Sequence, residues 1–158
     1  LDVDGVRLTV LAPDSAARAA AADANAASVV VLAEYRGVRI LLTGDAEREV
    51  ESDLVRRYGT ELRADILKVG HHGSTTSTTE PLLRVVRPRL ALVSVGAGNR
   101  YGHPGPAVLD GLRATGAHIL RTDDDGTIVV AADGSDRLLV STDEARWTLR
   151  RRSWRAGE

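Results

Sequence analysis

Three short loops hold the residues of this sequence that are best suited to chemistry. Each follows an apolar run, and the loops read Thr43-Gly44-Asp45, Gly70-His71-His72-Gly73-Ser74 and Asn99-Arg100-Tyr101-Gly102-His103-Pro104. Three of the four histidines fall in these loops. Because the ends of strands in an open α/β sheet converge on a ligand crevice, this pattern predicts one shared site.

Asp45 has two interpretations. It follows an apolar run and a glycine and opens an expected helix, where aspartate is a favoured N-cap because its side chain accepts a hydrogen bond from the first turn. Alternatively, its two carboxylate oxygens bridge two divalent cations, an arrangement that suits hard and borderline metals. The residue alone does not decide between a helix cap and a metal ligand.

The adjacent residues His71 and His72 lie between two glycines and have little core to pack into. Such a pair can divide its work, with one neutral imidazole binding a metal and the other contacting substrate or a carboxylate. The glycines allow a ligand to approach the backbone closely. The alternative is a pair of solvated loop histidines. The hydroxyls from Ser74 to Thr79 suit phosphate oxygens or the capping of the next helix.

His103 stands between a glycine and a proline, a rigid setting that holds an imidazole at a fixed angle. The donors that precede it, Asn99, Arg100 and Tyr101, suit an anionic substrate. The alternative is a loop histidine that simply packs on Tyr101. His118 lies within a strand pattern, so we expect it in the core or on an edge strand.

Alternating and β-branched runs predict strands with helices between them. The expected strands are Val6 to Leu11, Ser28 to Ala33, Val38 to Thr43, Asp65 to Val69, Arg89 to Val95, His118 to Thr122 and Thr127 to Ala131. The expected helices are Ala46 to Tyr58, Glu80 to Val86 and Pro106 to Thr115. A surface loop is expected from Pro13 to Ala27 and a β-turn from Asp123 to Gly126. Strands alternating with helices favour an α/β layer architecture with a mixed sheet.

The composition is that of one ordinary domain. The chain has 158 residues, of which 43% are hydrophobic and 27% charged, and its formal charge is -1. That balance gives no general attraction to nucleic acid or membrane, so any polyanion binding must be local. There is no cysteine, which leaves His, Asp and Glu as strong metal ligands. No apolar run is long enough to span a membrane. A first residue other than methionine, inside a strand pattern, is expected of a piece cut from a longer protein.

Taken in order, these segments resemble the second half of the metallo-β-lactamase fold as it occurs in the ComEC family of DNA-uptake proteins. The matching blocks are Asn25 to Val30, Ile40 to Glu47, Asp65 to Ser74, Pro88 to Val95, Asn99 to Pro104 and Arg121 to Thr127. The resemblance implies an αββα sandwich, present here as its second half only, with a mixed sheet flanked by helices. It also implies an active site at the sheet edges that holds two divalent metal ions, zinc or manganese.

The resemblance also implies roles for individual residues. Asp45 matches the metal-bridging aspartate and His71 the late metal-binding histidine, although related nucleases leave open whether His71 or His103 is the ligand. The positions that match the motifs facing the scissile phosphate are His72, Ser74, Tyr101 and His103. Those expected to bind substrate are Lys68, Asn99 and Arg100. The implied mechanism is attack on phosphorus by a metal-activated water, with charge stabilised by the metals and His103.

The first metal-binding motif of the family, a His-x-His/Asp-x-Asp-His cluster, belongs to the N-terminal half and does not occur in this sequence. The chain therefore supplies at most half of the ligands. We expect part of a nuclease that hydrolyses DNA phosphodiesters during DNA uptake and is inactive or weak alone. The alternatives are a non-catalytic module that binds nucleic acid or a partner, and a hydrolase of the same fold with another substrate.

The sequence also suggests where partners contact the chain. Residues 1–142 are expected to form the domain, and 143–158 a flexible basic tail whose Arg and Trp residues suit single-stranded DNA. Half a sandwich leaves one sheet face uncovered, so we expect the missing N-terminal half or a dimer mate to cover it. The resemblance further implies a bacterial parent protein embedded in the cell membrane, with this domain outside the bilayer.

Overall fold

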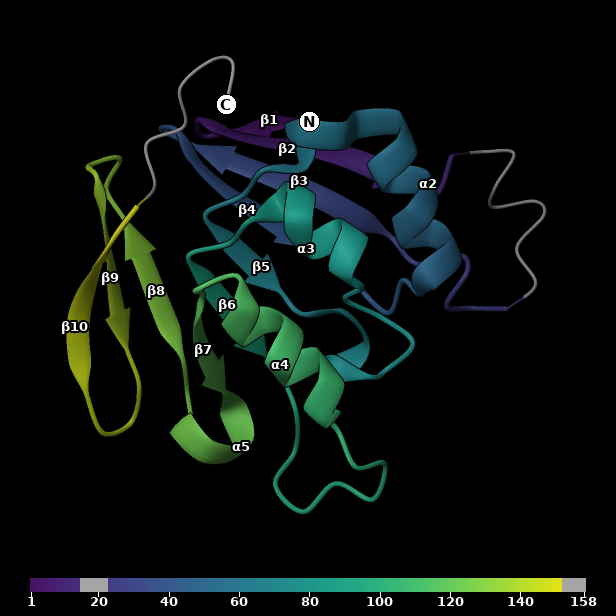
Figure 1. Cartoon of the computed structure of the whole chain (residues 1–158). Helices are drawn as coiled ribbons and strands as arrows, with labels where there is room; N and C mark the ends of the chain where they lie inside the picture. Colours follow the sequence, from purple (N-terminus) through teal and green to yellow (C-terminus); the bar gives the residue numbers. More distant parts are fainter. Residues whose placement is uncertain (15–22, 152–158) are drawn as a thin grey trace.

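A mixed seven-stranded sheet forms the centre of the protein (Figure 1). The computed structural model describes residues 1–14 and 23–151. The sheet follows chain order, with β1 (Asp2–Val3), β2 (Val6–Ala12), β3 (Val30–Tyr35), β4 (Val38–Leu42), β5 (Ile66–Lys68), β6 (Leu90–Val93) and β7 (His118–Arg121). Strands β1 to β4 pair antiparallel, and β4 to β7 pair parallel. The carboxyl ends of the parallel strands therefore lie side by side.

Helices cover one face of this sheet, because the connections between parallel strands must cross over it. They are α2 (Arg48–Tyr58), which continues into the short turn η1 (Gly59–Leu62), α3 (Glu80–Val86) and α4 (Pro106–Ala114). Leu54, Leu82 and Leu112 are completely buried in the same core as Leu41 and Leu67 of the sheet. Each such leucine contributes about 1.5–3 kcal/mol by leaving water. No helix in the described part of the chain is long and apolar enough to cross a membrane.

A small antiparallel sheet covers part of the opposite face. It contains β8 (Val129–Ala132), β9 (Arg137–Ser141) and β10 (Arg146–Arg150), in the order β10-β9-β8. Leu138 and Val140 of β9 share a core with Ile66, Leu90 and Leu120 of the large sheet. Helices, large sheet and small sheet are thus stacked in layers, which confirms the predicted mixed α/β layer architecture.

The small sheet leaves the antiparallel part of that face uncovered. Val10, Val31 and Leu42 lie opposite one another across β2, β3 and β4. Val10 is 60% exposed and Leu42 is 39% exposed. Val10 and Val31 also line a shallow groove of about 600 Å³ beside the N-terminus. Among the described residues, this apolar strip stays exposed on the sheet face.

The predicted strands and helices agree with the structure to within two residues at each end. The loop predicted from Pro13 to Ala27 lies partly outside the described residues. The β-turn predicted from Asp123 to Gly126 was wrong, because Thr122–Asp125 forms the helical turn α5. The Asp125 carboxylate accepts a hydrogen bond from the Arg121 backbone N–H at 2.7 Å. This bond holds the acidic residues of α5 against the end of β7.

The segment set apart as a flexible tail, 143–158, contains the strand β10 in its described part. Trp147 and Leu149 pack into the core between the two sheets, and the alternating residues Arg146, Thr148 and Arg150 are exposed. The Trp147 indole meets the His118 ring edge-on, with 5.4 Å between ring centroids. His118 is exposed on the edge strand β7, one of its two expected places. The remaining Arg and Trp residues of the tail, in 152–158, lie outside the described residues.

Candidate functional site

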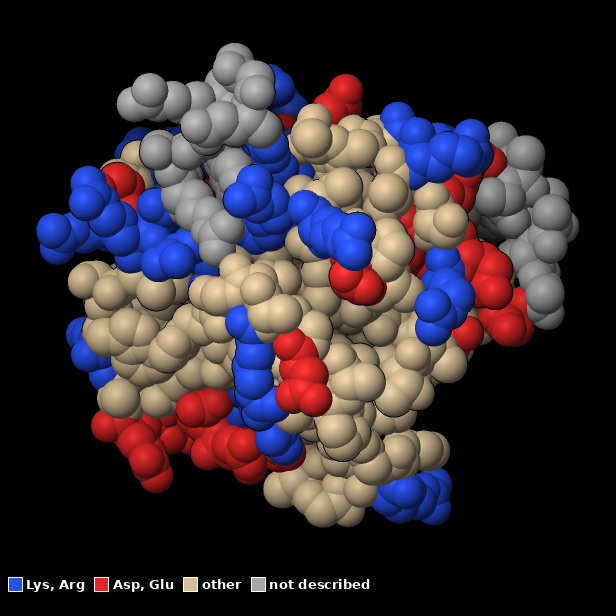
Figure 2. Space-filling model, viewed as in Figure 1, with Lys and Arg blue, Asp and Glu red and all other residues tan. Residues whose placement is uncertain are grey.

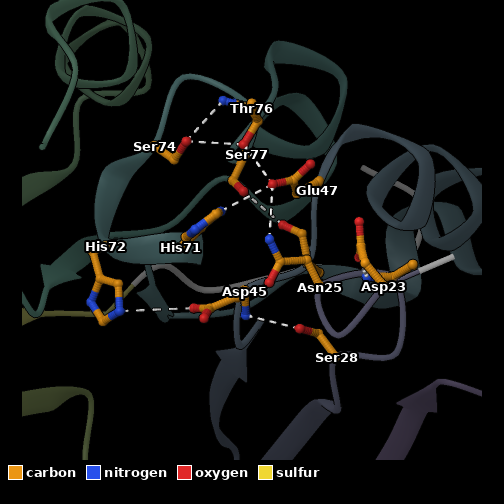
Figure 3. Close-up of polar contacts among 12 residues, drawn as sticks. Asp23, Asn25, Ser28, Asp45, Glu47, His71, His72, Ser74, Thr76 and Ser77 are labelled. Atoms are coloured by element: carbon orange, nitrogen blue, oxygen red, sulfur yellow. Dashed lines mark hydrogen bonds and ion pairs between the residues drawn. The ribbon is translucent and has the colours of Figure 1, made fainter. Parts of the chain in front are cut away.

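The loops that were predicted to share a site follow neighbouring parallel strands, and Figure 3 shows Asp45 beside His71 and His72. Asp45 follows β4, the turn η2 (Gly70–Gly73) follows β5, and the loop that carries His103 follows β6. The ring centroids of His71 and His72 are 6.5 Å apart, and those of His71 and His103 are 6.0 Å apart. The structure thus gathers the three loop histidines at one end of the sheet, beside Asp45.

Asp45 does not cap a helix. The N-cap of α2 is Glu47, and no side chain makes the capping hydrogen bond there. The Asp45 backbone N–H donates to Ser28 Oγ at 3.2 Å, which fixes the residue against the start of β3. Its carboxylate Oδ1 faces His72 Nε2 at 4.0 Å, and the side chain is 45% exposed. The Asp45 carboxylate therefore does not cap α2, and it is accessible to a ligand.

The two adjacent histidines sit in an unusual backbone conformation. His71 has φ 47° and His72 has φ 56°, so both occupy the left-handed region that L-residues rarely adopt. The His71 N–H donates to Gly44 O at 3.0 Å, and its carbonyl accepts from the Ser74 N–H at 2.9 Å. Strain of this kind persists only where the surroundings enforce it, and it is concentrated at functional sites.

The two imidazole rings contact different groups. His72 Nδ1 lies 2.7 Å from the Ser94 carbonyl, and it must donate because a carbonyl only accepts. His71 Nδ1 is buried and lies 3.2 Å from Glu47 Oε1, although the alignment falls short of a hydrogen bond. That same Glu47 oxygen accepts hydrogen bonds from Asn25 Nδ2 at 3.1 Å and from Thr76 Oγ1 at 3.0 Å. The His71 ring therefore faces a fixed carboxylate.

The hydroxyl-rich segment 74–79 is mostly structural. Ser74 is buried, and its hydroxyl is hydrogen-bonded to Thr76 Oγ1 at 2.9 Å, so its role in binding substrate stays a prediction. Ser77 Oγ donates to Ala46 O at 2.8 Å. The backbone N–H groups of Thr78 and Thr79 donate to the two carboxylate oxygens of Glu51, at 2.5 and 2.8 Å. Glu51 is completely buried in α2, and these two hydrogen bonds hold the segment that follows the turn η2 in place.

Burial raises the pKa of Glu51 above its ordinary value of 4.5, against the opposing hydrogen bonds from Thr79 and Thr78. Between pH 4.5 and its raised pKa, the folded state binds more protons than the unfolded state. The contribution of Glu51 to the free energy of unfolding is therefore complete below pH 4.5 and declines as pH rises, by at most about 1.4 kcal/mol per pH unit. We expect Glu51→Gln to remove this decline, as measured by urea unfolding at a series of pH values. Identical pH profiles for the variant and the wild type would contradict it.

The loop after β6 holds His103 in place through hydrogen bonds with Asn99, whose role in binding substrate stays a prediction. Asn99 Oδ1 accepts the His103 N–H at 3.0 Å, and Asn99 Nδ2 donates to the His103 carbonyl at 2.6 Å. The His103 ring stacks on Tyr101, with centroids 6.0 Å apart and planes at 21°. The Arg100 guanidinium lies 5.5 Å from the centroid of the exposed Tyr101 ring. The predicted packing of His103 on Tyr101 is therefore present, and it leaves His103 beside His71.

Lys68 ends β5 and is half-buried. Its Nζ donates to the Val69 carbonyl at 3.1 Å. Burial lowers the pKa of its ammonium group below the ordinary value of 10.5, and the Asp45 carboxylate opposes that shift. Lys68 thus adds positive charge near the Asp45 carboxylate, and its role in binding substrate stays a prediction.

Sequence reasoning missed three supporting residues, Asn25, Glu47 and Glu51. The first two lie within the matched blocks but received no role, because nothing local links Asn25 to Glu47 across 22 positions. Glu51 lies one helical turn beyond Glu47 and also received no role, because a glutamate in an amphipathic helix is typical of its solvent side. No group of three or more His, Asp or Glu residues that could hold a metal ion occurs within the described ranges, 1–14 and 23–151. The pair Asp45 and His72 provides two convergent donors.

Comparison with known proteins finds several relatives with similar levels of sequence identity. No family model matches the chain. It is 38% identical over 128 residues to ComE operon protein 3 of Bacillus subtilis, an alignment that covers 81% of this chain and 16% of that protein. It is 38% identical over 125 residues to competence protein ComA of Neisseria gonorrhoeae, covering 79% of this chain and 18% of that protein. Recombination protein 2 of Haemophilus influenzae is 39% identical over 108 residues, 68% of this chain and 13% of that protein.

These relatives share one class, that of bacterial competence and recombination proteins, and the alignments run through most of the chain. The chain belongs to the ComEC family. It spans less than a fifth of the length of the curated relatives it matches.

Proposed function

We propose that this chain is the second half of a metallo-β-lactamase-like nuclease domain that hydrolyses DNA phosphodiesters during competence. The observation that carries the proposal is the juxtaposition of Asp45, the His71-His72 turn and His103 at the carboxyl ends of β4, β5 and β6. Carboxylate and imidazole are the ligand types for zinc and manganese. The names of the relatives support a role in competence.

The donor set fits one side of a metal centre. Asp45 and one histidine of the His71-His72 turn would hold the ions, and the other ligands would come from a segment outside this chain. When bound, the ions would activate water and stabilise charge on the phosphate oxygens. His103 and Tyr101, with Arg100 at the rim, would bind and orient the scissile phosphate, and Lys68 would contribute positive charge from beneath.

The proposal extends to partners. The apolar strip of Val10, Val31 and Leu42 ends on β4, three residues before Asp45, so it lies next to the place where a completing segment would bind. We propose that the missing half of the domain covers it, with a second copy of the chain as the alternative. A parent protein embedded in the cell membrane and single-stranded DNA as substrate belong to the same proposal.

Asp45→Asn in the longer protein should lower metal-dependent cleavage of labelled single-stranded DNA by at least about 100-fold, since even supporting residues of metal sites cost 10–100-fold. Asn keeps the volume of the side chain but loses its charge. His118→Asn, on the exposed edge of β7, is the matched control and should cleave like the wild type. Cleavage by Asp45→Asn at the wild-type rate would refute the proposal.

The alternative, a binding module without catalysis, makes an opposite prediction. Figure 2 shows basic side chains gathered at the end of the molecule where β9 and β10 meet the β3–β4 turn, and those with contacts there are arginines. A module that uses this surface should bind DNA without added metal and lose affinity steeply with salt. Retained DNA binding with no cleavage under any divalent ion would favour that function.

A further inference from the structure

We infer that the ring of Tyr101 is a stacking surface for a nucleobase of single-stranded DNA, next to the phosphate that the proposed site would cleave. This inference rests on the proposed function and names a further part of the substrate that the chain contacts. It gives Tyr101 a role other than contact with the scissile phosphate, which the sequence resemblance implies for this position.

The Tyr101 ring is open to solvent. Tyr101 is 71% exposed, and it is the one exposed Tyr or Trp among residues 1–14 and 23–151. Its hydroxyl makes no hydrogen bond within these ranges, so no polar contact occupies the side chain. Because the ring stays in water, it contributes little to the hydrophobic core. The aromatic surface is therefore available to a ligand.

The loop after β6 holds this ring in place without a ligand. The Tyr101 and His103 rings form an offset stack, with centroids 6.0 Å apart and planes at 21°. His103 is itself fixed, because its N–H donates to Asn99 Oδ1 and its carbonyl accepts from Asn99 Nδ2. A ring that is already positioned loses less conformational entropy when a ligand binds.

The surroundings of the ring suit a nucleotide. A Cβ at Gly96, Gly98 or Gly102 would meet no described atom within 4 Å, so the loop stands clear of the described chain at these points. The Arg100 guanidinium lies 5.5 Å from the centroid of the Tyr101 ring, within the range of a cation–π contact. Unpaired bases stack on aromatic rings and on guanidinium planes, and a guanidinium also pairs with phosphate.

The place of the ring relative to the candidate site determines which base it meets. The His103 ring lies between Tyr101 and His71, with its centroid 6.0 Å from each of the two other rings. A strand whose phosphate lies at His71 and His103 therefore brings a neighbouring base to Tyr101. Stacking tolerates any base, since every base has a π face, so the contact selects nucleic acid and not a sequence. It also separates DNA from the other substrates that this fold hydrolyses.

The test compares two short single strands of equal length, one of thymidine nucleotides and one of abasic nucleotides, by fluorescence anisotropy with this chain. The abasic strand keeps the phosphates, so it measures all charge-based binding elsewhere on the chain. We expect the wild type to bind the abasic strand about 5- to 100-fold more weakly than the thymidine strand. The methyl proton resonance of a bound thymine should also shift upfield in NMR spectra, because the base lies over an aromatic ring.

Three variants assign the effect to the ring. Tyr101→Ala should weaken binding of the thymidine strand by the same factor, leave binding of the abasic strand unchanged and abolish the upfield shift. Tyr101→Phe should bind like the wild type, because stacking needs the ring and not the hydroxyl. His118→Asn removes an exposed ring on the edge strand β7, and as the matched control it should bind both strands like the wild type.

The outcomes separate the base contact from the proposed function. Equal affinity of the wild type for the two strands, or no saturable binding of the thymidine strand, overturns the inference. Tyr101→Phe that binds as weakly as Tyr101→Ala also overturns it, and shows a contact of the hydroxyl with phosphate instead. Cleavage by the longer protein that requires Asp45 would then still support the nuclease. Base-dependent binding through Tyr101, in a longer protein that cleaves no DNA with any divalent ion, supports the base contact and refutes the nuclease.

Discussion

Asp65→Ala is expected to lower the free energy of unfolding by about 3–5 kcal/mol, because it removes one partner of a buried ion pair. The Asp65 side chain is 0% exposed, and its Oδ1 lies 3.3 Å from Arg151 Nε. Its Oδ2 accepts the Arg39 backbone N–H at 3.0 Å. Arg151 also donates to the Ser135 and Gly37 carbonyls, so it links both sheets at the basic end seen in Figure 2.

Asp136→Ala is the control variant, because it removes one partner of an ion pair that is exposed and not buried. Asp136, which directly precedes β9, pairs with Arg150 of β10 at 2.8 Å, but the side chains are 56% and 81% exposed. An exposed pair is worth about 0–1 kcal/mol, so the control should unfold almost like the wild type. In urea unfolding followed by circular dichroism, Asp65→Ala should also cost less in an Arg151→Ala background. Equal losses for Asp65→Ala and Asp136→Ala would show that the buried pair does not join the sheets.

The elements that the sequence predicts well are those whose pattern is local. Val50 and Leu54 in α2 recur at helical spacing, and β-branched runs such as Val38 to Leu42 alternate. The small sheet was harder to predict. In β10 the inward residues Trp147 and Leu149 alternate with the exposed Arg146, Thr148 and Arg150. The strand was not predicted, because the many arginines of this segment favoured a flexible basic tail. The partner surface of the inward residues also lies more than a hundred residues away along the chain in β4, as Val38 shows.

The location of the site was predictable, whereas its contacts were not. Asp45, His71 and His103 each follow a strand, and parallel strands bring such loops together. The distribution of His71 and His72 between two carboxylates depends on two consecutive positive φ angles, which residue types alone do not specify. The contact of Asn25 with Glu47 depends on how β3 and α2 pack.

Gly73→Ala is expected to lower the free energy of unfolding by about 2–5 kcal/mol, from a left-handed alanine and an overpacked contact together. Gly73 has φ 85°, and a Cβ there would stand 2.5 Å from Pro104 Cβ and 2.9 Å from Pro104 Cα. The proline ring cannot rotate away, so its backbone must move. Gly105 N donates to Gly73 O at 2.8 Å, and this bond between the two loops would be strained as well.

The displacement should reach the site, because His103 directly precedes Pro104 and its ring lies 6.0 Å from that of His71. We therefore expect the imidazole resonances of both histidines to shift in Gly73→Ala, alongside the lower stability in urea. Gly96→Ala is the matched control, since a Cβ at Gly96 meets no described atom within 4 Å and its φ is not positive. A Gly73→Ala protein with wild-type stability and unchanged histidine resonances would show that the two loops are not held together at this contact.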